Sequence, residues 1–350
     1  MNILIVKPSS LGDIVHTLPV VGMIREHYPD SVISWVVNDS YAGLLDLCPD
    51  IDTRIVFKRK RLGHPRHWLE IFSFIRELRS LKFDIAIDFQ GLLRSALITR
   101  LSGAKKRVGF RNARECAPWF YTERVLLPAN LRHAQDKNMF LAQAALQLPD
   151  TTPVLPLASS EVDAGKLRKI LREHEIALDR PLLAVAPAAR WTTKCWPPGF
   201  FARILSDLHK QTLPSPPTVV CIGTADERSI GDMVGEQSES PVVNLMGETD
   251  LGALAELLRR SDALLTNDSG PMHLAVAVGT PVVALFGPTD PSLTGPYGDV
   301  HTVFTAECED GPCLQRKCKK NDPPDCHAAI NGEEVVAALK KIIETPDSEP

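Results

Sequence analysis

The sequence predicts an α/β protein made of two domains, each built on a parallel β-sheet. Along most of the 350 residues, short apolar runs rich in Val, Ile and Leu alternate with stretches of helical apolar spacing. This alternation is typical of parallel sheets covered by helices. The chain is also too long for one ordinary core and fits two domains of about 150 to 200 residues each. Because such sheets bind ligands at the carboxyl ends of their strands, we expect a central cleft between the domains.

The first domain is expected over residues 1–157. It begins with an apolar strand at 2–7, a turn at 8–13 and a helical pattern at 14–27, and a strand at 32–37 completes a β-α-β unit. Further elements predicted in this half are strands at 54–57 and 83–88, a helix that begins at Trp68, and a strand-to-helix turn at 89–95.

The second domain is expected over residues 158–330, after a proline-punctuated connector at 150–156. It begins with a helix at 159–175. Strands are then predicted at 182–186, 218–222, 242–245, 263–266 and 282–286, and helices at 198–209, 227–236, 251–260 and 271–278. A last amphipathic helix lies within 331–345, and we expect it to pack back toward the first domain.

Composition and charge narrow the kind of protein. No apolar run reaches the roughly 18 residues that span a bilayer, and the start lacks a basic leader with a cleavage site, so we expect a cytoplasmic protein. The first 150 residues contain 21 Lys and Arg against 15 Asp and Glu, although the whole chain has a net charge of −4. A basic half in an acidic protein indicates a domain that faces an anionic partner, the alternative being an ordinary solvated surface.

The stretch from Leu264 to Ala275 has the clearest pattern for a ligand site. An apolar strand runs into the turn Asn267-Asp268-Ser269-Gly270, and Pro271 then opens a helix at a position that proline tolerates. Unpaired N–H groups and the positive end of the helix dipole favour a phosphate at such a helix start. The alternative is that Asp268 or Ser269 only caps the helix.

Three motifs make the chain resemble a known family. They are Lys7-x-Ser9-Ser10-x-Gly12-Asp13-x-x-His16, Asp88-x-Gln90-Gly91-Leu92-x-x-Ser95, and Asn267-Asp268-Ser269-Gly270-x-x-His273 with its continuation Phe286-Gly287-Pro288-Thr289-Asp290-Pro291. Together they resemble the bacterial lipopolysaccharide heptosyltransferases of glycosyltransferase family nine, which have the GT-B fold of two Rossmann-like domains. The Asp13 and Gln90-Gly91 segments are more similar to the first heptosyltransferases, whereas the cysteine-rich C-terminal segment is more similar to the second.

The resemblance implies the substrates and the chemistry. The second domain would bind ADP-L-glycero-D-manno-heptose, and a hydroxyl of the inner-core Kdo-lipid A acceptor, held by the first domain, would attack with inversion. Asp13 matches the catalytic base of the family, the alternative being a helix cap. Lys194 matches the lysine that contacts the diphosphate and would stabilise the departing ADP.

Further donor-binding residues are expected around Lys194. Thr192, Thr193 and the amides of Ser269 and Gly270 would complete an anion cradle. Asp268 matches the residue that binds the donor sugar. Glu227, after a strand end and a glycine, is placed to hold a ribose, with Asp226 as the alternative. For His273, a packed structural histidine is as consistent with the sequence as a ligand contact.

The acceptor side is expected among basic residues of the first domain. The candidates for acceptor binding are Ser10, Gly12, Arg94, Arg111, Arg114, Lys58 and Arg61. Arginine pairs well with carboxylate and phosphate, which suits a lipid A-linked core oligosaccharide, and the same surface suits peripheral contact with the anionic inner membrane. Nucleic acid is not expected, because no recognition motif accompanies the basic residues.

No cofactor and no catalytic metal are expected. The pair Asp50-Ile51-Asp52 has the Asp-x-Asp form of metal-dependent sugar transfer, but it lies far in sequence from the donor motifs and is interpreted as a turn. A separate cluster, Cys308-x4-Cys313-x4-Cys318-x7-Cys326, has spacings too wide for a typical zinc site. A structural metal, a disulfide and reduced thiols all remain open for these cysteines.

Other functions remain open at this stage. Another nucleotide-sugar glycosyltransferase of the cell envelope would share these motifs. A nucleotide-sugar epimerase of similar fold would convert the donor without an acceptor, and a non-catalytic nucleotide-sugar-binding protein would bind the donor without turnover.

Overall fold

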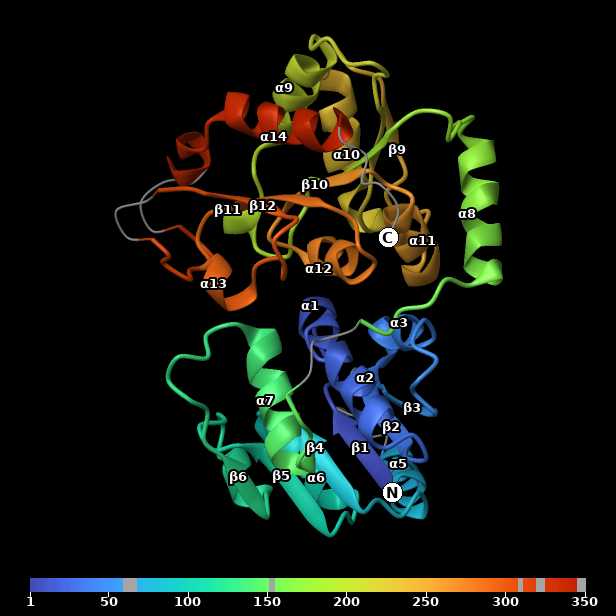
Figure 1. The fold of residues 1–350 in the computed structure, drawn as a ribbon, viewed down its shortest axis with the longest axis vertical. Helices are drawn as coiled ribbons and strands as arrows, with labels where there is room; N and C mark the ends of the chain where they lie inside the picture. The colour runs from blue at the N-terminus through green and yellow to red at the C-terminus, as the bar shows by residue number, and fades with distance from the viewer. Residues whose placement is uncertain (59–67, 151–154, 308–310, 319–324, 345–350) are drawn as a thin grey trace. The chain divides into compact units, whose positions relative to one another are not determined.

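In a computed structural model of the protein, the chain forms two compact units, Met1–Ala158 and Ser159–Pro350. This division lies one residue from the boundary expected from the sequence. The structure describes residues 1–58, 68–150, 155–307, 311–318 and 325–344. Each unit is a parallel sheet with helices packed against it (Figure 1).

Among the described residues, the first unit contains six parallel strands in the order β3-β2-β1-β4-β5-β6. The strands are β1 (Asn2–Val6), β2 (Val32–Asn38), β3 (Thr53–Phe57), β4 (Ile85–Asp88), β5 (Lys106–Phe110) and β6 (Glu123–Val125). The helices are α1 (Leu11–Val15), α2 (Leu18–His27), α3 (Ala42–Leu45), α5 (Trp68–Ser80), α6 (Leu93–Leu101) and α7 (Ala134–Leu146), with short 3-10 turns η1 (Asp39–Tyr41) and η3 (Ala117–Phe120).

The second unit repeats this architecture in its described part, with the order β12-β11-β10-β7-β8-β9. Its strands are β7 (Leu182–Ala186), β8 (Thr218–Cys221), β9 (Val242–Asn244), β10 (Ala263–Asn267), β11 (Val282–Phe286) and β12 (Thr302–Thr305). The α-helices are α8 (Glu161–Glu173), α9 (Pro198–His209), α10 (Arg228–Gln237), α11 (Leu251–Arg259), α12 (Gly270–Ala277), α13 (Pro291–Thr294) and α14 (Gly332–Glu344), and the 3-10 turns are η4 (Thr192–Lys194), η5 (Ala225–Glu227) and η6 (Asp325–Ala329).

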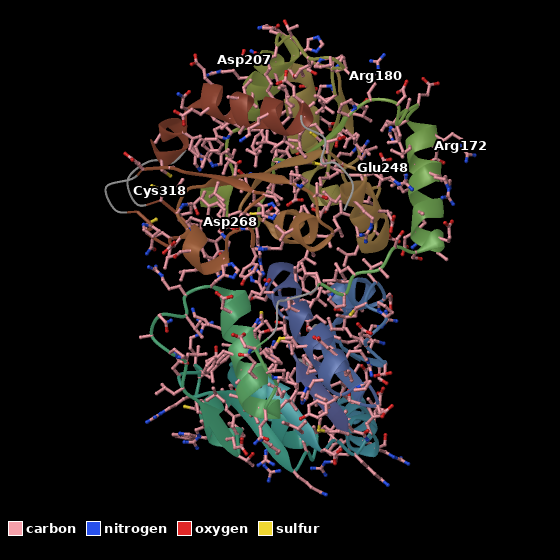
Figure 2. The ribbon with its side chains drawn as sticks, viewed as in Figure 1. Arg172, Arg180, Asp207, Glu248, Asp268 and Cys318 are labelled. Atoms are coloured by element: carbon pink, nitrogen blue, oxygen red, sulfur yellow. The ribbon has the colours of Figure 1, made fainter. Side chains whose placement is uncertain are left out.

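In each sheet, the strand order shows where a doubly wound sheet binds its ligand, which is the point at which the order of the strands reverses. Strand order reverses between β1 and β4 in the first unit and between β7 and β10 in the second. Loops at the carboxyl ends of such neighbouring strands diverge and leave a crevice for ligands. In the second unit, Asp268 lies in the loop after β10 (Figure 2). The motifs singled out in the sequence follow β1 and β4 in the first unit and β10 and β11 in the second.

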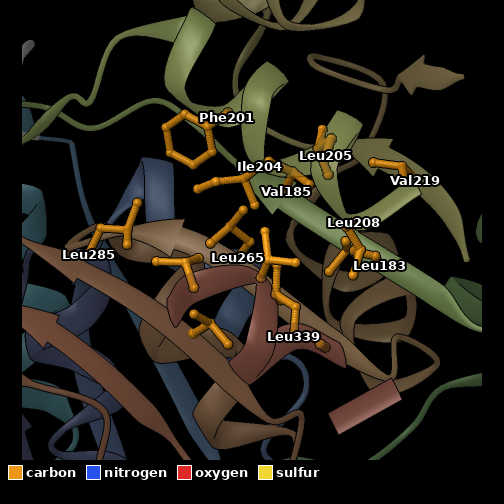
Figure 3. Packing of buried hydrophobic residues seen from close by; sticks show 14 of the residues in the cluster. Leu183, Val185, Phe201, Ile204, Leu205, Leu208, Val219, Leu265, Leu285 and Leu339 are labelled. Carbon is orange, nitrogen blue, oxygen red and sulfur yellow. The ribbon is translucent and has the colours of Figure 1, made fainter. Parts of the chain in front are cut away.

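The core of the second unit includes the C-terminal helix. Phe201 and Ile204 of α9 pack with Leu265 of β10 and Leu339 of α14 in one buried cluster (Figure 3). The C-terminal helix is therefore part of this core, and its expected packing toward the first domain stays a prediction. Its apolar stripe is covered by α9, β10 and β11, so the helix completes its own unit.

The predicted elements mostly coincide with the observed ones, with one informative exception. The single helix expected at 14–27 is divided into α1 and α2. Pro19 has no N–H group and occupies the first turn of α2, where helix N–H groups have no intrahelical partner. Among the described helices, none is both long and apolar enough to cross a membrane.

Candidate functional site

A buried ion pair lies at the switch point of the second unit. Lys194 ends η4, in the loop after β7, and Asp268 follows β10. Lys194 Nζ lies 2.5 Å from Asp268 Oδ2, and Thr289 Oγ1 donates to the same oxygen at 2.6 Å. Only 17% of the lysine side chain and 5% of the aspartate side chain are exposed. The arrangement presents a lysine and a carboxylate together at the ligand-binding edge of the sheet.

Asp268 does not cap the helix that follows it. The N-cap position of α12 belongs to Ser269, whose backbone is extended and whose side chain makes no capping bond. The Ser269 hydroxyl instead lies 3.2 Å from Thr266 Oγ1. The capping alternative is thus not what the structure shows. The first turn of α12, which begins at Gly270, keeps its N–H groups clear of side-chain caps, as an anion site requires.

The other donor candidates have varied surroundings. Thr193 is buried and its hydroxyl donates to the Gln315 carbonyl, whereas Thr192 is exposed. Glu227 accepts the N–H and the hydroxyl of Thr224, each at 2.8 Å, and so fixes the start of the 3-10 turn η5, which precedes α10. His273 is buried within α12. Thr192, Glu227 and the start of α12 are thus accessible, and His273 fits the structural interpretation better.

A pocket of about 710 Å³ lies next to the ion pair. Thr289, the hydroxyl partner of Asp268, is one of its lining residues. The other lining residues come from the loop after β11, the end of β12 and the segment that follows it: Gly287, Asp290, Pro291, Thr305, Ala306, Glu307, Gly311 and Pro312. Its volume is within the range of small-molecule sites, roughly 300–1,000 Å³.

In the first unit, Asp13 lies in the first turn of α1, shortly after β1. Its Oδ2 accepts the backbone N–H of Ser10 at 3.0 Å and the Ser10 hydroxyl at 2.6 Å, and its Oδ1 lies 3.5 Å from Lys7 Nζ. Lys7 also donates to the Phe89 carbonyl, which links the loops after β1 and β4. The side chain of Asp13 is 45% exposed. Asp13 therefore fixes the start of α1, and its carboxylate still reaches solvent.

The Asp88 carboxylate organises the loop after β4. This side chain is fully buried, and it accepts the N–H groups of Gln90 and Gly91 and the hydroxyls of Ser95 and Tyr121. Burial raises the pKa of the Asp88 carboxyl, an effect that the four donors oppose. The network holds the Gln90-Gly91 turn in place, and Gln90 in turn accepts the N–H of Ser9, which lies between β1 and α1.

We expect Tyr121→Phe to destabilise the protein by about 1–3 kcal/mol, because the buried Asp88 carboxylate loses one of its donors. The measurement is the free energy of unfolding from urea titration. Tyr41→Phe is the matched control, because the structure gives the partly exposed Tyr41 hydroxyl no hydrogen bond within the described residues. Equal stability of Tyr121→Phe and the native protein would contradict this account.

The acceptor candidates lie on the surface of the first unit where the structure describes them. Arg94 in α6 and Arg111 and Arg114 after β5 have exposed side chains. None of these three arginines forms an ion pair with a carboxylate in the described part of the chain. Ser10 is the N-cap residue of α1, and Gly12 lies in the first turn of that helix. Lys58 is exposed, and Arg61 lies outside the described residues.

The side chains of the two candidate metal motifs have different surroundings. Asp52 accepts the Ile33 N–H at 2.7 Å and pairs with Arg25 at 2.8 Å, so this carboxylate fixes the turn before β3. Cys313 and Cys326 are partly buried and Cys318 is exposed (Figure 2), whereas Cys308 lies outside the described residues. Within the described ranges, no three His, Cys, Asp or Glu side chains gather as a metal site would require.

Some functional candidates were not assigned from the sequence. Thr289 and Lys7 stand inside the motifs that carry the resemblance, but no role followed from their positions. Tyr121 has no local signal at all, because it lies 33 residues from its partner Asp88.

The comparison with known proteins decides the family. The family model described as glycosyltransferase family 9 (heptosyltransferase) matches residues 71–322, well over half of the chain. The chain belongs to glycosyltransferase family 9. It is therefore a glycosyltransferase, and its paired Rossmann-like units form the GT-B fold.

Individual relatives agree with this assignment. Lipopolysaccharide heptosyltransferase 1 of Pseudomonas aeruginosa is 27% identical over 372 aligned residues, which cover 99% of each chain. Lipooligosaccharide heptosyltransferase 2 of Haemophilus influenzae is 28% identical over 323 residues, covering 87% of this chain and 88% of the relative. The heptosyltransferase WaaC of Escherichia coli, solved with ADP, has a TM-score of 0.77 at 23% identity, covering 98% of this chain and 100% of that one.

Proposed function

We propose that this family 9 glycosyltransferase transfers a heptose from ADP-L-glycero-D-manno-heptose, with inversion, to the inner-core Kdo-lipid A acceptor of lipopolysaccharide. The observation that carries the proposal is the Lys194–Asp268–Thr289 cluster at the switch point of the second unit. A relative of known structure binds ADP, and its similarity to this chain covers both units. We place the donor in the second unit, which carries this cluster, and the acceptor in the first.

The proposed chemistry is a single displacement. The acceptor hydroxyl loses its proton to Asp13 as its oxygen bonds to the anomeric carbon, and the bond from that carbon to the ADP oxygen breaks. Lys194 and the N–H groups at the start of α12 stabilise the negative charge that develops on ADP. Asp268 orients Lys194 and accepts hydrogen bonds from the donor sugar.

Metal independence is part of the proposal. Lys194 and the α12 N-terminus are preorganised positive groups that stabilise a leaving diphosphate. In the Asp-x-Asp pair, Asp52 is already held by Arg25 and the Ile33 N–H. We expect transfer to continue unchanged in EDTA. Activity that is lost in EDTA and restored by Mg²⁺ or Mn²⁺ would contradict this part of the proposal.

The surface of the first unit supports an anionic acceptor. Arg94, Arg111 and Arg114 are exposed and carry no carboxylate partner in the described ranges, so their guanidinium groups are available for phosphate or carboxylate. We propose that the enzyme works at the cytoplasmic face of the inner membrane, where its lipid-linked acceptor lies. Vesicle co-sedimentation with and without anionic lipid measures this association.

The test of the whole proposal is a transfer assay read by mass spectrometry. Purified enzyme is incubated with truncated lipopolysaccharide and, separately, with ADP-heptose, other ADP-sugars and UDP-sugars. We expect a single addition of a heptose mass, and only from ADP-heptose. Conversion of the donor without an acceptor would indicate an epimerase, and donor binding without any turnover would indicate a binding protein; either outcome would overturn the proposal.

A further inference from the structure

The segment 311–318 belongs to the cysteine-containing C-terminal part of the chain. Hydrogen bonds fix it to the loops that follow β7 and β11 in the second unit. Thr193 Oγ1 donates to the Gln315 carbonyl at 2.8 Å, and Thr192 Oγ1 donates to the Arg316 carbonyl at 3.4 Å. On the other side, the Leu314 N–H donates to the Pro288 carbonyl at 2.8 Å. Residues 314–316 thus connect the loop that carries Lys194 to the loop that carries Thr289.

A second contact reinforces this connection from η6. The buried His327 ring stacks on Trp196, with ring centroids 4.9 Å apart, and its Nε2 lies 3.0 Å from the Thr193 carbonyl. Because a carbonyl oxygen only accepts, Nε2 carries the proton in this bond. Burial lowers the pKa of His327 and so favours the neutral ring. The backbone next to Lys194 is therefore held by the C-terminal part of the chain.

This anchoring brings a second cation to Trp191. Lys194 Nζ lies 4.8 Å from the centroid of the Trp191 ring, and the Arg316 guanidinium carbon lies 5.1 Å from the same centroid. Both distances are within the range of cation–π contacts. Arg316 therefore lies beside the lysine that is expected to meet the diphosphate, although the two residues are 122 positions apart in the sequence.

The charge balance at this position favours an anion. The charge of Lys194 is compensated by Asp268 at 2.5 Å, so that ion pair alone has little net charge for a diphosphate. Arg316, in contrast, is exposed, and none of the carboxylates that the structure describes forms an ion pair with it. A guanidinium is planar and binds phosphate oxygens in a bidentate manner. The uncompensated charge next to Lys194 is thus supplied by Arg316.

We propose that Arg316 contacts the phosphates of the nucleoside diphosphate donor, as a second cation beside Lys194. The proposal rests on the proposed function, because it assumes an ADP-linked donor in the second unit. It gives the 311–318 segment a direct role in the site, in which the segment carries a charged side chain to the substrate. Trp191 holds the guanidinium in place, and Thr192 and Thr193 fix the backbone that presents it.

The experiment compares ligands with and without phosphates. Binding of ADP and of adenosine is measured by calorimetry for the native enzyme, Arg316→Gln, Arg316→Lys and the matched control Lys317→Gln, which removes an adjacent exposed charge. For Arg316→Gln we expect ADP affinity to fall about 10-fold, as for loss of one charged hydrogen-bonding group, with adenosine affinity unchanged. Arg316→Lys should recover part of the loss, and Lys317→Gln should bind both ligands as the native enzyme does.

Each other outcome has a distinct meaning. Native ADP affinity in Arg316→Gln would overturn the inference and leave the proposed function intact. Equal losses of affinity for ADP and adenosine in Arg316→Gln would assign Arg316 a purely structural role. If Lys317→Gln lost as much ADP affinity as Arg316→Gln, the loss would come from general surface charge. Either result would overturn the inference. A native enzyme that binds no ADP would overturn the proposed function itself.

Discussion

Asp13→Asn is expected to abolish most heptose transfer while leaving ADP binding intact. An amide of the same size can still accept the hydrogen bonds of Ser10, but it cannot take a proton from the acceptor hydroxyl. Loss of a general base lowers the rate by about 10²- to 10⁴-fold. The measurement is the initial rate with ADP-heptose and truncated lipopolysaccharide, together with calorimetric titration of ADP.

The control separates the base from a role in the fold. Asp30→Asn changes an exposed carboxylate of the same unit and should retain full activity. Because Asp13 also fixes the start of α1 and lies near Lys7, the unfolding midpoint of each variant is measured as well. Near-normal turnover in a folded Asp13→Asn variant would contradict the assignment of Asp13 as the catalytic base.

The sequence could predict the site where the chemistry depends on loops that follow strands. Asp13 and Asp268 each follow an apolar run that is recognisable by composition, and the order of elements implied parallel sheets. The carboxyl ends of parallel strands meet at one edge, so residues far apart in sequence converge there. Lys194 and Asp268 are 74 positions apart, and their direct contact follows from this rule plus the strand order of the second sheet.

Other features could not be predicted from one sequence, for physical reasons. Strand β6 reads Glu-Arg-Val and has no continuous apolar run, because it forms an edge of its sheet. The amphipathic stripe of α14 predicts that one face of the helix is buried, but it does not show against which element. In the structure, this face packs on α9, β10 and β11. Pairs such as Asp88 with Tyr121 depend on tertiary packing alone, since Gly109 leaves the space that the Tyr121 ring fills.

The second large effect is expected at Lys194. In Lys194→Met, the Asp268 carboxylate stays buried with the Thr289 hydroxyl but without its cation. Removing one partner of a buried pair costs about 3–5 kcal/mol of stability. ADP affinity should fall by about 10- to 100-fold, because a charged contact to the diphosphate is lost as well. Urea unfolding and calorimetry measure the two losses, and Lys210→Met, which breaks an exposed pair with Glu239, should change neither.

The double variant Lys194→Met/Asp268→Asn separates these two roles of the lysine. Neutralising Asp268 removes the unpaired buried charge, so much of the lost stability should return relative to Lys194→Met, as a coupling between contacting residues. ADP affinity should not return, because the phosphates still lack the cation. If the double variant bound ADP as tightly as the native enzyme, Lys194 would act only as the partner of Asp268, and the diphosphate assignment would be wrong. Recovery of stability without recovery of binding is therefore the result that identifies Lys194 as a ligand of the donor.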